Sequence, residues 1–241
     1  MSVVFAGGPV IPDFGQGSSC ERNNGWFCAD WLHAHWHDTL QPALVQHIEL
    51  TLIAVGIGFV LAAALALAGF RYRFLDPPIG LFADFLYTIP SLALFQLLVP
   101  ITGLTVTTVE IALVSYTLLI LYRNMISGLR AVPPEALEAA RGTGLTRMQT
   151  FLRVELPLAL PAILPGLRIA TVSTISIATV ASFVIAKGLG SPIFIALEQD
   201  VFKTEIFTAG GMVVVLALVA DGLLVLLQRG LTPWARLGRT A

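Results

Sequence analysis

The sequence predicts an all-α integral membrane protein with about five transmembrane helices and an extracytoplasmic N-terminal extension. Hydrophobic residues make up 56% of the 241 residues and charged residues only 12%, against roughly 25% charged residues in a soluble domain. Several uncharged stretches reach the length of about 20 residues that a helix needs to cross a bilayer. Basic residues gather at alternate connections between these stretches, as in multi-pass proteins. The net charge of −1, without a basic run, gives no indication of nucleic-acid binding.

The N-terminal extension, residues 1–42, is polar and rich in turn-forming residues. It lacks the basic start and the small-residue cleavage site of a secretory signal peptide, so we expect the mature chain to retain it. Trp31 and Trp36 predict a short interfacial helix just outside the first span, because tryptophan favours the headgroup region.

The extension also carries three alternating histidines and two cysteines. Residues at i and i+2 of a helix do not share a face, so His33, His35 and His37 are expected to be solvated; a metal site is the alternative. Cys20 and Cys28, with seven residues between them, can form a disulfide in an oxidising compartment, and two unpaired thiols are the alternative. Their spacing alone is not a metal signature.

The first two spans differ in regularity. Leu50–Gly69 is a run of twenty residues without a charge, which matches the thickness of a bilayer core. The next uncharged stretch, Phe85–Val109, is interrupted by Pro90 and Pro100. It predicts one kinked helix that ends near Pro100, followed by a turn around Gly103.

Three further spans follow. The third must include Glu110, because only twelve uncharged residues separate it from Arg123. The fourth, Ile169–Ala186, is rich in serine and threonine, which allow close helix packing. The fifth, Ile206–Leu227, contains Asp221.

The basic residues predict the orientation of the chain. One side of the membrane receives ten arginines: Arg71, Arg73, Arg123, Arg130, Arg141, Arg147, Arg153, Arg229, Arg236 and Arg239. The other side receives Arg22, Lys187 and Lys203. The first side is expected to be cytoplasmic. The extension then lies outside, residues 43–230 form one membrane domain, and residues 231–241 form a cytoplasmic tail.

The connection between spans three and four, residues 133–161, is the longest charged passage of the chain. Pro134 is well placed to begin a helix. Gly144 is expected in the turn that ends this helix. Thr146–Gln149 has the spacing of a capping box, which predicts a second helix that Pro157 would end. Two short helices joined by a glycine turn are suited to docking another protein; a hairpin that merely connects two spans is the alternative.

This connection resembles the E-A-A-x3-G-x9-I-x-L-P loop in the membrane subunits of binding-protein-dependent ABC importers. The matching residues are Glu138, Ala139, Ala140, Gly144, Leu156 and Pro157, with Val154 in place of isoleucine. Similarity to the osmoprotectant branch, the permeases for glycine betaine, choline and carnitine, extends over about residues 40–230. It is carried by residues 88–94, 154–161, 166–171 and 188–190, with Lys187 where that branch usually has glycine.

The resemblance implies the type I ABC importer permease fold and a place in the plasma (inner) membrane of a prokaryote. Glu138 would make a polar contact with the ATPase, Ala139 and Ala140 would form the close-packing face, and Gly144 the turn. The implied partners are cytoplasmic ABC ATPase subunits, an extracytoplasmic substrate-binding protein and a second permease subunit, either a copy or a paralogue. The chain has no G-x4-G-K-[ST] loop, so we expect no cofactor here, with ATP bound and hydrolysed by the partner.

Polar residues within the spans are candidates for a translocation path. They are Thr88, Pro90, Ser91, Gln96 and Glu110, to which Asp221 adds a second carboxylate. Hydrogen bonding between helices is the alternative role for the hydroxyl and amide groups, and a position near an interface is the alternative for the carboxylates. No aromatic cage for a quaternary ammonium group is evident inside the spans, so selectivity is expected to reside in the binding protein.

Three other functions are alternatives. A permease for another small solute, such as an amino acid, is the first alternative. A secondary transporter or channel often has inverted repeats, which are not evident here. A membrane enzyme would need a catalytic motif in or beside the spans, and the sequence shows none.

Overall fold

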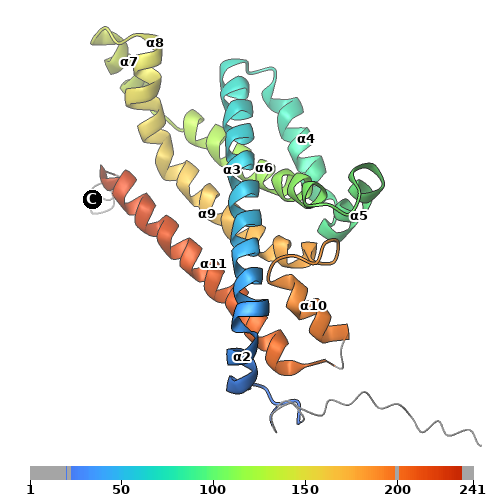
Figure 1. Cartoon of the computed structure of the whole chain (residues 1–241). Coiled ribbons are helices and arrows are strands. Elements are labelled where there is room, and N and C mark those ends of the chain that lie inside the picture. The colour runs from blue at the N-terminus through green and yellow to red at the C-terminus, as the bar shows by residue number, and fades with distance from the viewer. Residues whose placement is uncertain (1–19, 21–22, 199–200, 235–241) are drawn as a thin grey trace, which may run out of the picture.

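The computed structural model describes residues 20, 23–198 and 201–234, and within these ranges the regular elements are all helices (Figure 1). They are α2 (Ala29–His35), η1 (Trp36–Leu40), α3 (Gln41–Arg71), α4 (Asp76–Thr88), α5 (Ser91–Thr102), α6 (Val106–Arg130), α7 (Pro134–Gly142), α8 (Arg147–Thr150), η2 (Phe151–Glu155), α9 (Leu156–Ala181), α10 (Gly190–Glu198) and α11 (Lys203–Leu231), where η denotes a π-helical turn. Four helical segments can span a membrane, or five if α4 and α5 count as one, which confirms the predicted all-α membrane fold.

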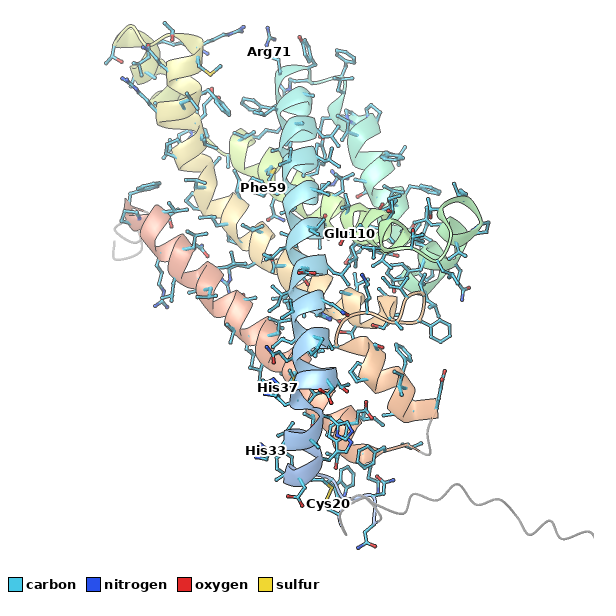
Figure 2. All side chains as sticks on the ribbon, viewed as in Figure 1. Cys20, His33, His37, Phe59, Arg71 and Glu110 are labelled. Atoms are coloured by element: carbon cyan, nitrogen blue, oxygen red, sulfur yellow. A yellow bond between two sulfur atoms is a disulfide. The ribbon has the colours of Figure 1, made fainter. Side chains whose placement is uncertain are left out.

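The molecule has two distinct ends. Helices α7 and α8 lie at one end, with Arg71 at the close of α3; α2 and Cys20 lie at the other (Figures 1 and 2). These are called the α7 end and the α2 end below. Residues 1–19, Arg22, Arg236 and Arg239, on which parts of the predicted extension, tail and orientation rest, lie outside the described residues.

The first spanning helix begins earlier than the sequence predicts. From Ala29 to Arg71 the chain forms one helical segment of 43 residues, so the short helix predicted around Trp31 and Trp36 is continuous with the first spanning helix. Trp31 is buried, and its ring meets that of Phe202 edge-on, with 5.4 Å between the centroids. This side of α2 therefore packs against protein, whereas Trp36 is exposed.

A π-helical turn allows Pro42 to enter this long helix. The amide of Gln41 donates to the carbonyl of Trp36, five residues back rather than four. In a regular α-helix the ring of a proline collides with the carbonyl four residues before it. The wider turn moves that carbonyl away from the ring, so α3 continues from η1 without a break.

A second π-helical turn allows the helix to continue through Pro157. The amide of Leu156 donates to the carbonyl of Phe151, and Pro157 follows in the first turn of α9. The prediction that Pro157 ends a helix is therefore wrong, because Arg147–Ala181 is one helical segment of 35 residues. The fourth span is part of that segment and ends at Ala181, five residues before the predicted Ala186. Two more prolines lie inside α9, Pro161 and Pro165.

The second span is two helices rather than the predicted single kinked one. Helices α4 and α5 meet at an angle of 98°. Ile89 has an extended backbone (φ −70°, ψ 125°), as expected of a residue before proline, and Pro90 caps α5. The hydroxyl of Tyr116 donates to the carbonyl of Ile89, which satisfies an acceptor freed by the break. Pro100 lies inside α5, and the turn follows at Gly103, with φ +74°.

Helix α6 is the centre of the packing, since α3, α4, α5 and α9 all contact it. Polar bonds fasten α4 to it. The carboxylate of Asp76 accepts hydrogen bonds from Tyr122 at 2.5 Å and from Arg130 at 2.7 Å. Asp84 and Arg123 form a second ion pair at 2.5 Å. These contacts hold the broken span against the buried α6.

The turn between α9 and α10 is held by two side chains of α3. Gly188, with φ +75°, donates its amide to Gln46 Oε1 at 3.1 Å. The fully buried His47 accepts the amide of Leu189 at Nδ1 (3.2 Å), and its Nε2 lies 3.0 Å from the carbonyl of Ile175. Because Nδ1 accepts, the proton must be on Nε2, and the imidazole is neutral.

Replacement of His47 by phenylalanine should therefore lower the stability of the protein. The change leaves the buried amide of Leu189 without its acceptor, which typically costs about 1–3 kcal/mol. Denaturant-induced unfolding in detergent micelles measures the free energy of unfolding. The matched control is His33→Phe, on the exposed side of α2. Equal stability of the two variants would contradict the assignment.

Candidate functional site

The charged connection folds into a helix, a tight turn and a second helix. Gly144, with φ +77°, lies in the left-handed region that favours glycine. Its amide donates to the carbonyl of Arg141 at 3.0 Å, and the amide of Leu145 donates to that of Ala140 at 3.2 Å. The final carbonyls of α7 are thereby satisfied within the turn.

The predicted capping box at the start of α8 is confirmed. Thr146 Oγ1 accepts the amide of Gln149 at 3.4 Å, and Gln149 Oε1 accepts the amide of Thr146 at 2.9 Å. This reciprocal pair fixes the direction in which the second helix leaves the turn.

The alanines of the motif have different surroundings. Glu138 and Ala139 are exposed, whereas Ala140 is only 5% exposed and lies inside the corner of its own chain. Ala140 is therefore not available to a partner in the way that Ala139 is. A bulky residue at 140 would disturb the corner itself before it disturbed any contact.

The second helix has an inner and an outer apolar side. Phe151 and Leu156 pack against the core around α6. Met148 and Leu152, one turn apart, are 65% and 54% exposed. Val154 and Pro157 are half-buried. We define the coupling surface as Glu138, Ala139, Gly144, Met148 and Leu152; the sequence pattern contained the last pair but did not show that it faces outward.

The predicted path residues are only partly brought together. Thr88, Pro90 and Ser91 lie at the α4–α5 break, where the hydroxyl of Thr88 donates to the carbonyl of Phe85 at 2.7 Å. Glu110, on α6, lies near mid-height of the molecule (Figure 2). Its carboxylate oxygens are buried and, within the described part of the chain, have no hydrogen-bond partner. Gln96 is exposed on α5.

An ion pair between α9 and α11 was not predicted. Arg168 Nε donates to Asp221 Oδ1 at 2.8 Å, and Arg168 Nη2 donates to Oδ2 at 2.9 Å. The side chains are 32% and 35% exposed. The signal in the sequence was one basic and one acidic residue, each within an otherwise uncharged stretch; nothing there indicated that the two stretches pack together.

At the α2 end, Cys20 and Cys28 form a disulfide, with their Cα atoms 5.8 Å apart. Cys28 is buried. Of the histidines nearby, His35 Nδ1 lies 3.0 Å from the carbonyl of Trp31 and His37 Nδ1 lies 2.8 Å from Gln41 Oε1. Among the described residues, no group of three His, Cys, Asp or Glu side chains is placed to hold a metal ion.

The disulfide loop is bonded to the start of α11. Asn24 Nδ2 donates to the carbonyl of Val201 at 3.1 Å, and its Oδ1 accepts the amide of Lys203 at 2.9 Å. The hydroxyl of Thr204 donates to the carbonyl of Gly25 at 2.8 Å. The loop therefore ties the described part of the extension to the last spanning helix.

The chain is similar to known proteins both in sequence and in fold. Residues 50–233 match the family described as binding-protein-dependent transport system inner membrane component. The chain is 34% identical over 189 residues to the glycine betaine/carnitine/choline transport system permease protein OpuCB of Bacillus subtilis, covering 78% of this chain and 86% of that protein. It is 37% identical over 194 residues to the osmoprotectant import permease protein OsmW of Salmonella typhimurium, covering 78% and 89%.

The fold resembles a permease of known structure. A chain of the MetNI methionine ABC transporter, solved in inward-facing conformations, superposes with a TM-score of 0.69 at 20% identity. The match covers 83% of this chain and 98% of that one. At this identity the likeness concerns the fold alone.

The turn geometry makes a direct prediction for Gly144→Ala. A Cβ at this position meets no atom within 4 Å, so the cost comes only from the left-handed backbone, about 1–2 kcal/mol. The amides of residues 144 and 145 should therefore exchange hydrogen faster, as measured by mass spectrometry. Gly142→Ala is the control, because its Cβ is equally unobstructed but lies in α7. Equal exchange in both variants would argue against the turn.

Proposed function

Because the chain belongs to the family of inner membrane components of binding-protein-dependent transport systems, we propose that it is the permease subunit for osmoprotectants such as glycine betaine, choline or carnitine. As a member of this family, the chain is a membrane-embedded subunit of a transport system. The substrate class is supported by relatives at 34–37% identity that match over most of both lengths and are named for glycine betaine, carnitine and choline, for choline alone, or for osmoprotectants as a class. That agreement is the observation that carries the proposal.

The coupling surface is the proposed contact with a cytoplasmic ATPase. It projects at the α7 end, away from the core around α6 (Figure 1). Exposed Met148 and Leu152 offer apolar area, Ala139 permits close approach, and the exposed Glu138 supplies a charge next to Ala139 in the chain. Small and apolar groups next to a few charges suit insertion into a groove of a partner. ATP would be bound and hydrolysed by that partner.

The orientation follows from this assignment. The α7 end would be cytoplasmic and the α2 end, with its disulfide, would face the oxidising side of a prokaryotic plasma membrane. Residues 1–42 would form the extracytoplasmic extension, residues 43–230 the transmembrane domain and residues 231–241 a cytoplasmic tail. A substrate-binding protein would deliver the solute at the α2 end, and a second permease subunit would complete the path.

The α4–α5 break is the proposed location of part of that path. Non-helical backbone at membrane depth is tolerated only where protein or water covers it. Thr88, Pro90 and Ser91 lie at the break, and Gln96 is exposed beyond it. Glu110 adds a buried carboxylate without a partner in the described part of the chain. These groups suit a permissive path, with selection made by the binding protein.

Reconstitution tests the proposal. The chain, its ATPase and its binding protein are placed in proteoliposomes, and uptake of radiolabelled glycine betaine, choline and carnitine is measured with and without ATP. We expect ATP-dependent uptake of at least one of them. Transport of an unrelated solute alone would reject the substrate class, and ion-driven uptake by the isolated chain would reject the ATP-driven mechanism.

The ATPase contact is tested with Ala139→Trp. An indole at this exposed site should block close approach and weaken capture of the ATPase by about tenfold or more, a loss of about 1.4 kcal/mol. Capture by the detergent-solubilised permease measures it. Ala34→Trp, exposed on α2 at the opposite end, is the control. Normal capture by the Ala139 variant would remove this residue from the interface.

A further inference from the structure

The ion pair between Arg168 and Asp221 lies deep within two spanning helices. The 29 residues of α11 measure about 44 Å, roughly 14 Å more than a bilayer core. If α11 is centred, Asp221, ten residues from its end, lies about 8 Å inside the core. Arg168 is flanked by the charge-free stretches 156–167 and 169–186. Both charges are therefore at a depth where lipid would surround any uncovered side chain.

The pair is only partly covered by its own chain. The two side chains are 32% and 35% exposed, even though they share two hydrogen bonds. A charged residue inside a spanning helix is costly, and such residues face a protein interior or a water-filled cavity. The uncovered part of this pair is thus unsuited to a lipid-facing surface.

The neighbouring surface of α9 carries an exposed hydroxyl. Ser176, about two turns beyond Arg168, is exposed. Ile169 is also exposed, at 55%. By contrast, Leu223 lies on the side of α11 away from Asp221 and is 61% exposed. A hydroxyl and the ion pair are therefore both exposed along α9, whereas Leu223 is exposed on the far side of α11.

We propose that the Arg168–Asp221 pair and the adjacent surface of α9 form part of the wall of a water-filled translocation path, in the half nearer the α7 end. This inference rests on the proposed transport function. The pair presents one positive and one negative group with no net charge. At this point of the wall the carboxylate is compensated by Arg168, so a zwitterion such as glycine betaine, or a cation such as choline, is not retained there.

Cysteine accessibility tests the proposal on the assembled complex. The chain has only two cysteines, and both are in the disulfide, so a new cysteine is its single free thiol. Ile169→Cys and Ser176→Cys are treated in proteoliposomes with a membrane-impermeant maleimide. The control is Leu223→Cys, exposed on the far side of α11. Labelling of each permease band is compared before and after denaturation.

We expect labelling of both α9 variants to be on the order of tenfold faster than that of the control, because maleimide reacts with the thiolate, which forms readily only in water. Rates equal to or below the control in the intact complex, with full reaction after denaturation, would overturn the proposal. Labelling requires no transported solute. Failure of all osmoprotectants in the uptake assay would therefore reject the proposed substrates and leave the labelling result interpretable.

Discussion

The satisfaction of backbone polar groups is the constraint on which this structure depends, because lipid offers them no partner. Each irregularity in the spans has a local solution. The π-helical turn before Pro42 and the one before Pro157 move a carbonyl away from a proline ring. Tyr116 bonds the carbonyl of Ile89 at the α4–α5 break. His47 accepts an amide of the turn after α9. The prolines and breaks are thereby kept within a packed bundle.

Much of this architecture could be predicted from the sequence. Charge-free stretches of about 20 residues located the long helices, and the Thr146–Gln149 spacing identified the capping box, since both depend on contacts local in the chain. The predictions are wrong where the surrounding structure changes the usual effect of a proline on a helix. Pro157 ends an isolated helix, but a π-helical turn absorbs it here. Pro90 kinks most helices, yet here it separates two helices at 98°.

In the candidate site, too, the local features could be predicted from the sequence and the features that depend on packing could not. The motif located the connection and its turn, but only packing reveals that Ala140 faces inward while Ala139 faces outward. The Arg168–Asp221 pair joins residues 53 positions apart, and its formation depends on how α9 and α11 pack. Likewise, the disulfide loop is fixed by Asn24 contacts with the chain near residue 203, at a separation no local pattern encodes.

The continuity of the segment Arg147–Ala181 has a mechanical consequence. Its 35 residues extend about 52 Å, from the outward-facing Met148 to the far side of the bundle. A tilt of about 5° around one end would displace the other by about 4–5 Å, comparable to the rise of one helical turn. A small rotation imposed at α8 is therefore amplified along the segment to its far end.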